Sequence, residues 1–383
     1  MPADLAVIVM EQSQDELSAI VRQILQVDAT PIGELTLRKI GRSAGSATAG
    51  IFHVAGRART QAGESKWSAV LKVLGTPENL PTGTERDGST EVDVYRSGVF
   101  AQLCGGIRAA NCYAIQPKRD LLLLWMEDLT DAPQAPWSAD HFIAAARHLG
   151  KFNAFWPEES LPQWDWLSRL GFRAEFTGSP HFQSVFERLD TQRDQPLMRE
   201  FVSATSLEQL KQLWRDCDVL LTLAETTSKG VCHGDCHPKN LFPITGSNGN
   251  SYTIGIDWVK VGICNHGVDL GHMLASPAKW LELTPEEAAL LREPILDAYL
   301  VGLTESGWSG SADGVRITYF VRLACGALRI ANLVSRMVED PRFIEQGQRL
   351  IGRPVAQIVP QWAQLLRFYL DCRDEALRIA ERL

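Results

Sequence analysis

Hydrophobic positions in the first third of the chain follow two different periods. Residues 12–27 carry apolar side chains at helical spacing and predict an amphipathic helix: Leu17, Ile20, Val21, Ile24 and Leu25. Short apolar runs follow, and they predict five strands: residues 35–40, 50–54, 67–74, 112–115 and 121–126. Between the third and fourth of these runs, residues 89–103 return to the helical period. This part of the chain is therefore expected to form a small antiparallel sheet with one main helix.

From about residue 138 onward the pattern is mainly helical. Ser138 can cap a helix with one apolar stripe, made of Phe142, Ala145, Leu149, Phe152 and Trp156. Residues 284–287 combine a capping box with proline at the first helical position, and residues 362–383 predict a closing helix. A strand-rich first third before a helical remainder favours an α+β class with two lobes. We expect an N-terminal lobe of residues 1–127 and a C-terminal lobe of residues 128–383, with a ligand cleft between them.

The composition restricts the classes of partner that the protein can bind and the compartment in which we expect it. The chain has 383 residues, of which 45% are hydrophobic and 22% charged, and its formal net charge is −8. This balance predicts a globular chain and gives no cationic excess for nucleic acid or an anionic membrane. The start of the chain lacks a basic segment before an apolar core, and no apolar run is long enough to span a bilayer. The eight cysteines are irregularly spaced, which favours reduced thiols. We therefore expect a cytoplasmic protein.

Residues 231–258 carry the densest candidate chemistry. An apolar run at 241–244, a turn-rich stretch at 246–251 and a second apolar run at 252–256 predict a β-hairpin. In such a hairpin Asn240 and Asp257 would flank the open end, with Cβ atoms roughly 5 Å apart. Their hard oxygen atoms suit Mg²⁺, which also uses the phosphates of a substrate as ligands. Asp235 lies five residues before Asn240 and could accept a proton from a substrate hydroxyl.

The motif at residues 233–240 resembles the catalytic loop of the protein-kinase-like phosphotransferases, in particular the aminoglycoside phosphotransferase and choline kinase group. The spacing from Asp235 to Asn240 equals that in the protein-kinase catalytic loop. By this resemblance Asp235 is the catalytic base, Asn240 and Asp257 hold Mg²⁺, and His233 supports the loop. Asp269 resembles a family aspartate that braces the loop by hydrogen bonds. The resemblance covers residues from about 35 to 275 and implies a two-lobed protein-kinase-like fold that uses ATP, with GTP as an alternative.

Two features of the first lobe fit a phosphate site. A loop of small residues between the first two strands could fold its amides over phosphates, although a plain hairpin turn explains it equally well: Gly41, Ser43, Gly45 and Ser46. Lys72 interrupts an apolar strand, so its charge needs a partner. By the resemblance, that partner is Glu91, and the ammonium group is aimed at the α- and β-phosphates.

The segment that joins the two lobes is the expected site of the nucleobase. Glu127 and Leu129 fall directly after the fifth predicted strand, where the family connects its lobes. The resemblance implies that backbone groups from Glu127 to Leu129 meet the edge of adenine. Their side chains carry no sequence signal for this contact.

Other chemistry can be read into the same residues. Six soft ligands gather near the catalytic motif, but their spacing does not match a zinc site or a haem attachment, so packed reduced cysteines are favoured: Cys232, His233, Cys236, His237, Cys264 and His266. An aromatic group could form a cation–π cage for a quaternary ammonium, although core packing is the commoner role of such residues: Phe152, Phe155, Trp156, Trp164 and Trp166.

These features together predict an enzyme that transfers the γ-phosphoryl group of a nucleoside triphosphate to a hydroxyl of a small molecule. A choline, amino-alcohol or sugar kinase of the same fold is an alternative, and so is a nucleotide-binding pseudokinase without turnover. A protein kinase is disfavoured because no activation segment is evident after Asp257. The sequence leaves the acceptor and the oligomeric state open.

Overall fold

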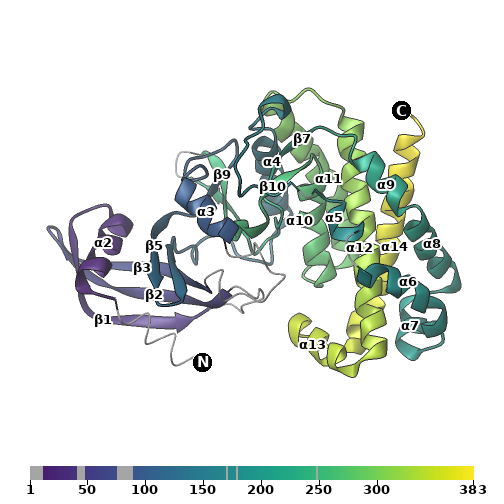
Figure 1. Cartoon of the computed structure of the whole chain (residues 1–383), viewed down its shortest axis with the longest axis horizontal. Coiled ribbons are helices and arrows are strands. Elements are labelled where there is room, and N and C mark those ends of the chain that lie inside the picture. Colours follow the sequence, from purple (N-terminus) through teal and green to yellow (C-terminus); the bar gives the residue numbers. More distant parts are fainter. Residues whose placement is uncertain (1–11, 41–47, 76–88, 170, 178–179, 247–248) are drawn as a thin grey trace. The chain divides into compact units, whose positions relative to one another are not determined.

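The computed structural model describes residues 12–40, 48–75, 89–169, 171–177, 180–246 and 249–383 (Figure 1). The chain forms two compact units. The first comprises Met1–Leu103, Arg108–Ala132 and Ile254–Lys260, and the second comprises Cys104–Ile107, Pro133–Thr253 and Val261–Leu383. Because Ile254–Lys260 belongs to the first unit, Asp257 lies in a different unit from Asp235 and Asn240. Each unit is described by itself.

The first unit is built on a five-stranded antiparallel sheet of order β1-β2-β3-β6-β5. Each strand covers one of the five apolar runs, except that β1 ends one residue before its run does, and the first three strands are longer than those runs. The strands are β1 (Ala29–Lys39), β2 (Thr48–Thr60), β3 (Gly63–Gly75), β5 (Cys112–Lys118) and β6 (Leu121–Met126). The predicted sheet is confirmed.

Side chains of β3 point alternately to the two faces of this sheet. One face packs against the core, and the other carries Lys72. Leu71 and Val73 are fully buried in a core that also contains Trp125 of β6 and the apolar stripe of helix α2 (Gln14–Leu25). The helix begins at Ser13, whose side chain and Glu16 form a capping box. Successive side chains of a strand point to opposite faces, so Lys72 projects away from α2. It is paired with Ile51 on β2 and with Leu124 on β6.

The helix expected at residues 89–103 is shorter than its apolar pattern indicates. Helix α3 spans Ser89–Ser97 and is followed by Gly98 at φ 65°, a left-handed conformation that ends the helix. Val99 and Leu103 match the helical period but lie in the turn-rich segment that follows. A short strand, β4 (Ile107–Ala109), comes next, and no sequence pattern predicted it.

The second unit is mainly helical, as expected. Helix α4 (Ala139–Asn153) starts at the predicted cap Ser138, and α11 (Pro285–Glu305) starts at Thr284. The other helices of eight or more residues in the described part of this unit are α6 (Pro180–Gln192), α8 (Ala204–Arg215), α9 (Cys217–Ala224), α10 (Val268–Lys279), α12 (Ala312–Glu339), α13 (Pro341–Ile351) and α14 (Val355–Ala380). The shorter α5 (Ala174–Thr177) and α7 (Pro196–Phe201) complete this set.

Four short strands flank the predicted catalytic loop. β7 (Lys229–Cys232) leads into the loop and pairs with β10 (Gly262–Asn265) in an antiparallel ladder. β8 (Leu241–Thr245) directly follows the loop. It is hydrogen-bonded to β9 (Ser251–Gly255) in a sheet of strand order β4-β9-β8. The hairpin predicted from residues 241–256 is therefore confirmed.

Helix α12 is the central helix of the second unit. It contacts α14, α10, α6 and α9, and Figure 1 shows it running beside α14. In the described part of the chain it is the one helix that is long and apolar enough to cross a membrane, but 83% of its most apolar window is buried inside the protein. This degree of burial is typical of a core helix in a globular protein.

Candidate active site

The loop of residues 233–240 is held by a single buried carboxylate. Asp269, in the first turn of α10, accepts hydrogen bonds from His233 N at 2.8 Å and from Gly234 N at 3.0 Å. Its Oδ2 also accepts from Asn153 Nδ2 at 3.2 Å. Gly234 has φ 80°, which a residue with a Cβ rarely adopts. Asp269 therefore fixes the start of the loop, in the bracing position that the resemblance implies for it.

His233 lies inside this loop as predicted. Its side chain is completely buried, and its Nδ1 accepts a hydrogen bond from Asp235 N at 3.3 Å. A backbone N–H can only donate, so Nδ1 of His233 is unprotonated in this contact. The ring therefore holds the backbone of the residue predicted to act as the base.

The carboxylate of Asp235 is 18% exposed, and several polar side chains surround it. Its Oδ1 lies 3.1 Å from His272 Nε2, and its Oδ2 lies 4.0 Å from His237 Nε2 and 3.4 Å from Asn240 Nδ2. A partly exposed carboxylate can still reach a substrate hydroxyl. The position of Asp235 is therefore compatible with general base chemistry.

His272 and Arg322 are two members of this site that sequence reasoning missed. Arg322 Nη2 lies 2.7 Å from His272 Nδ1, and a guanidinium group can only donate. Nδ1 is then the acceptor, so the ring proton is on Nε2, which faces Asp235. Burial is the main cause that lowers the pKa of His272 to about 4, so the ring is neutral near pH 7. Arg322 is 50 positions from His272, and no local pattern links the two.

Asn240 presents an oxygen atom that suits a divalent cation. Its Nδ2 donates to the carbonyl oxygen of Asp235 at 3.0 Å, and the residue is buried. Because the amide nitrogen is used inside the loop, the amide oxygen is the atom left for a metal. The donor set fits Mg²⁺, which prefers hard oxygen ligands. Metal binding by Asn240 stays a prediction.

Lys72, Glu91 and Asp257 meet in the first unit. Lys72 Nζ lies 2.5 Å from Glu91 Oε2 and 2.9 Å from Asp257 Oδ1. Burial alone would lower the pKa of Lys72, but the charges of Glu91 and Asp257 raise it, so the ammonium stays protonated. The side chain of Asp257 is 39% exposed and keeps a second carboxylate oxygen for a cation. Asp257 also has φ 61°, an unusual backbone conformation for a residue other than glycine.

The proposed distance between Asn240 and Asp257 stays a prediction, because the two residues belong to different units. Each has the right type of ligand atom in its own unit. The predicted phosphate loop, Gly41, Ser43, Gly45 and Ser46, lies outside the described residues.

A cavity of about 740 Å³ in the first unit adjoins one of the two residues predicted at the nucleobase. Glu127 lines it, together with His53 and Ser68 from the sheet. The Glu127 carboxylate pairs with both terminal nitrogens of Arg108, at 2.8 and 2.9 Å, and its backbone N–H donates to Asn111 O. The volume is typical of a small-molecule site.

Asp128, between the two predicted nucleobase contacts, also lines this cavity and has a fixed geometry. His53 Nε2 lies 2.9 Å from its Oδ2, and Thr130 donates to its Oδ1 through both N and Oγ1. Burial opposes ionisation, but hydrogen bonds from Ser68, Thr130 and His53 lower the pKa of Asp128 overall. Leu129 accepts a backbone hydrogen bond from Ala132 N at 3.0 Å. Sequence reasoning included Asp128 in the connecting segment but assigned no role to its side chain, and it did not single out His53.

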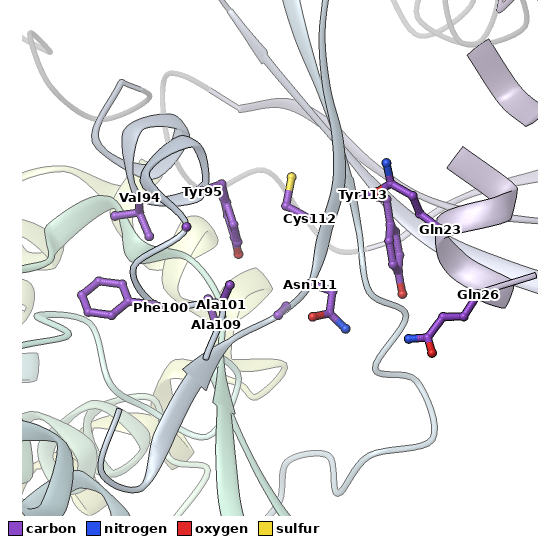
Figure 2. A pocket seen from close by; sticks show the side chains of 12 residues that line it. Gln23, Gln26, Val94, Tyr95, Phe100, Ala101, Ala109, Asn111, Cys112 and Tyr113 are labelled. Atoms are coloured by element: carbon purple, nitrogen blue, oxygen red, sulfur yellow. The ribbon is translucent and has the colours of Figure 1, made fainter. Parts of the chain in front are cut away.

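A second cavity in the first unit, of about 400 Å³, contains none of the predicted site residues (Figure 2). Figure 2 shows Tyr95, which belongs to α3, beside Cys112 of β5, with Tyr113 of β5, Gln23 of α2 and Gln26, which follows α2, at one side. The hydroxyl of Tyr95 is buried and has no hydrogen-bond partner among the described residues. Burial raises the pKa of this phenol.

The residues considered for a soft-metal site are part of the packing. All eight cysteines are free thiols. Cys236 Sγ donates to Asp269 O at 2.8 Å and Cys232 Sγ to Cys264 O at 3.7 Å. Within the described ranges, no three histidine, cysteine or acidic side chains gather as metal ligands would.

The aromatic residues considered for a cage contact one another. Ring centroids are 4.7 Å apart for Phe155 and Trp156, 5.7 Å for Trp156 and Trp164, and 4.9 Å for Trp164 and Trp166. Phe152 is completely buried, whereas Phe155 is exposed. The group is thus partly core and partly surface, and whether it contacts a ligand stays open.

A small antiparallel sheet with a buried lysine–glutamate pair, and a helical unit with a braced His-Gly-Asp loop, define a protein-kinase-like phosphotransferase. The sequence model described as the phosphotransferase enzyme family matches residues 115–311, which is more than half of the chain. The chain belongs to this family, and it is therefore a transferase of the kinase type. Comparison with curated protein sequences gives no match.

Comparison with solved structures finds similarity at low sequence identity. The chain is similar to a microcompartment-associated aminopropanol kinase at 15% identity, with a TM-score of 0.51 over 94% of this chain and 99% of the other. It is also similar to the amicoumacin kinase hAmiN in complex with AMP-PNP, Ca²⁺ and Ami, at 13% identity and a TM-score of 0.46 over 84% and 91% of the two chains. The aminoglycoside phosphotransferase APH(3'')-Id from Streptomyces rimosus, in complex with ADP and streptomycin, has 15% identity and a TM-score of 0.41 over 80% and 97%.

Proposed function

We propose that the protein transfers the γ-phosphoryl group of ATP to a hydroxyl group of a small molecule. The observation that carries the proposal is the braced loop, in which Asp269 holds the backbone and leaves the carboxylate of Asp235 partly exposed. Family membership supports a phosphotransferase, and the loop supports an oxygen nucleophile as its acceptor.

In this reaction a bond forms between the acceptor oxygen and the γ-phosphorus, and the bond from that phosphorus to the leaving ADP oxygen breaks. The acceptor proton passes to the carboxylate of Asp235, which the ring of His233 and the amide of Asn240 hold in place. Lys72, anchored by Glu91, orients the phosphates. Mg²⁺ bound by Asn240 and Asp257 would neutralise charge on the phosphates.

Positioning and electrostatics account for most of the rate in such a transfer, because the protein forms no covalent intermediate. The large cavity lined by His53, Ser68 and Glu127 offers a place for the nucleobase in the first unit. GTP in place of ATP, and a choline, amino-alcohol or sugar acceptor, are variants of the same proposal.

The test measures ADP release in a coupled assay with ATP, Mg²⁺ and a panel of hydroxylated metabolites that includes aminoglycosides, choline, sugars and hydroxy acids. We expect ADP release to be stimulated by an acceptor, to require Mg²⁺, and to disappear in Asp235→Asn. Nucleotide binding without acceptor-stimulated turnover across the whole panel would instead support a pseudokinase.

A further inference from the structure

A small pocket in the second unit is lined by positive charge. His272 and Lys279 of α10 line it together with Arg322 and Arg329 of α12. Its volume is about 20 Å³, room for about one water-sized group. A pocket of this size can admit one end of a molecule and not a sugar ring.

One carboxylate pairs with both arginines of this pocket. Glu175 Oε2 lies 3.4 Å from Arg322 Nη2 and also pairs with Arg329, so one carboxylate serves two guanidinium groups. Arg322 is only 2% exposed. Burial and the neighbouring charge of Arg322 lower the pKa of Arg329, although a guanidinium stays protonated in proteins. The charge of Arg322 is therefore held away from water beside two further cations, and an anion in the pocket would offset the free-energy cost of burying it.

Two donor groups of this pocket have no acceptor among the described residues. The Nε atoms of Arg322 and Arg329 are both buried and lack a hydrogen-bond partner in the part of the chain that the structure describes. Aromatic rings lie near the guanidinium groups, with Arg322 Cζ 5.2 Å from the Phe172 ring and Arg329 Cζ 5.1 Å from the Phe176 ring. Such rings attract a cation electrostatically but do not replace an acceptor in the plane of the guanidinium. The unpaired N–H groups thus favour an anionic oxygen ligand.

Helix α10 leaves space for this arrangement. A Cβ atom at Gly271 would lie 2.5 Å from Arg322 Cγ, so any larger residue there would displace the arginine. The residue that follows, His272, lines the pocket and also faces Asp235 Oδ1 at 3.1 Å. The pocket and the predicted base are therefore separated by one imidazole ring.

We infer that this pocket binds the carboxylate of the acceptor, so that the substrate is a small hydroxy acid. The inference rests on the proposed function, because it places the acceptor hydroxyl at Asp235. One oxygen of a carboxylate matches the size of this pocket, accepts from the guanidinium donors and adds a negative charge. The same pocket repels the ammonium groups of choline or an aminoglycoside. His272 keeps the carboxylates of substrate and base apart with a neutral ring.

The test compares acceptors that differ only in the carboxylate: D-glycerate with glycerol, L-serine with ethanolamine, and D-gluconate with sorbitol. ADP release is measured for each pair with wild-type protein and Arg329→Gln, and calorimetry measures binding of the three acids without turnover. We expect the acid of at least one pair to be preferred, and Arg329→Gln to reduce its kcat/KM about tenfold or more, since a hydrogen bond to a charged group is lost. The partner without the carboxylate should change less than about twofold. Arg316→Gln, which removes a cation from the same helix outside the pocket, is the matched control.

Each outcome decides the inference separately from the proposed function. Turnover with neutral or cationic acceptors alone, or an acid preference unchanged in Arg329→Gln, overturns the inference and leaves phosphotransfer standing. Binding of an acid that Arg329→Gln abolishes, without any turnover, supports the anion site and contradicts phosphotransfer. Absence of any acid preference in both measurements also overturns the inference. If Arg329→Gln unfolds, Lys279→Gln replaces it with the same expectations.

Discussion

Glu91 Oε2 lies 2.5 Å from Lys72 Nζ, although the two residues are 19 positions apart in the sequence. Both side chains are buried, so neither charge has bulk water around it. Lys72 has a second partner in Asp257, whereas Glu91 Oε1 has no hydrogen-bond partner among the described residues. The lysine therefore depends on two acidic side chains from distant parts of the chain.

Replacing Glu91 with glutamine should destabilise the first unit and weaken nucleotide binding. The glutamine side chain has nearly the same shape as that of Glu91 but no charge, so the buried ammonium group of Lys72 is left with one carboxylate partner. Breaking a buried ion pair lowers the free energy of unfolding by about 3–5 kcal/mol. Because Lys72 keeps its contact with Asp257, we expect a loss of about 3 kcal/mol for Glu91→Gln. Denaturant unfolding measures the loss, and the KM for ATP should rise about tenfold. Asp93→Asn on the same helix is the control, and an equal effect in both variants would contradict the pairing argument.

Asp235→Asn should abolish turnover and keep the nucleotide site. The amide is nearly isosteric but cannot accept a proton, and removal of a general base lowers rates by about 10²–10⁴-fold. ADP affinity, measured by calorimetry, should stay within about twofold of the wild type because the proposed mechanism places the residue at the acceptor and not at the nucleotide. Parallel loss of ADP binding and activity would count against its role as base.

Asn240→Ala should raise the Mg²⁺ concentration needed for half-maximal activity. The substitution removes the oxygen assigned to the metal, and loss of a group at a metal site lowers metal affinity about 10–100-fold. Asn240→Asp keeps an oxygen atom at this position and should shift the Mg²⁺ requirement less. Activity is measured as Mg²⁺ is titrated at saturating ATP. Identical Mg²⁺ curves for wild type and Asn240→Ala would remove Asn240 from the metal site.

The hairpin beside the loop of residues 233–240, the sheet and the need of Lys72 for a partner could be predicted because each has a local signal, whereas the family resemblance named Glu91 as that partner. A charged residue in an apolar strand needs a partner, and two apolar runs around a turn form a hairpin. The end of α3 was missed because the apolar period continues to Leu103, while the left-handed conformation of Gly98 ends the helix. Here the conformation of one residue outweighs a hydrophobic pattern.

His272 and Arg322, beside Asp235, could not be predicted because their contacts join distant parts of the chain. Arg322 reaches His272 from a helix that begins 40 residues after it, at Ala312, and its own helix reads as ordinary core. Glu175, which pairs with Arg322, comes from a helix of four residues. Periodicity identifies which face of a helix is buried, but it does not identify which polar groups meet there.

Asp269→Asn should destabilise the fold and lower kcat more than it raises KM. The carboxylate accepts from two backbone N–H groups and one side-chain amide, so an amide would turn its own donors toward them. The expected loss is roughly 2–3 kcal/mol of unfolding free energy, and the loosened loop would misplace Asp235. Asp313→Asn, an exposed residue in the first turn of α12, is the control. Equal unfolding free energies for the two variants would contradict the bracing role.

The buried ring of His266 should make stability depend on pH. Its Nδ1 lies 2.9 Å from Ser228 Oγ and its Nε2 lies 3.2 Å from Asn153 O. Burial lowers its pKa from 6.5 to about 4. Between these values the unfolded chain binds a proton that the folded chain does not. The contribution of His266 is therefore complete above about pH 6.5 and is lost as the pH falls toward 4, by at most roughly 3 kcal/mol.

His266→Gln should flatten this dependence, because glutamine does not titrate. Urea unfolding at pH 7, 6 and 5 measures the slope, and the wild type should lose more stability on acidification than the variant. His148 contributes a pH dependence of stability of the same sign to the wild type and to the variant, since burial also lowers its pKa to about 4. His141→Gln serves as the control, because glutamine can replace His141 in the capping box at Ser138. If His266→Gln and wild type lose equal stability between pH 7 and 5, the neutral buried ring is not the cause of the acid sensitivity.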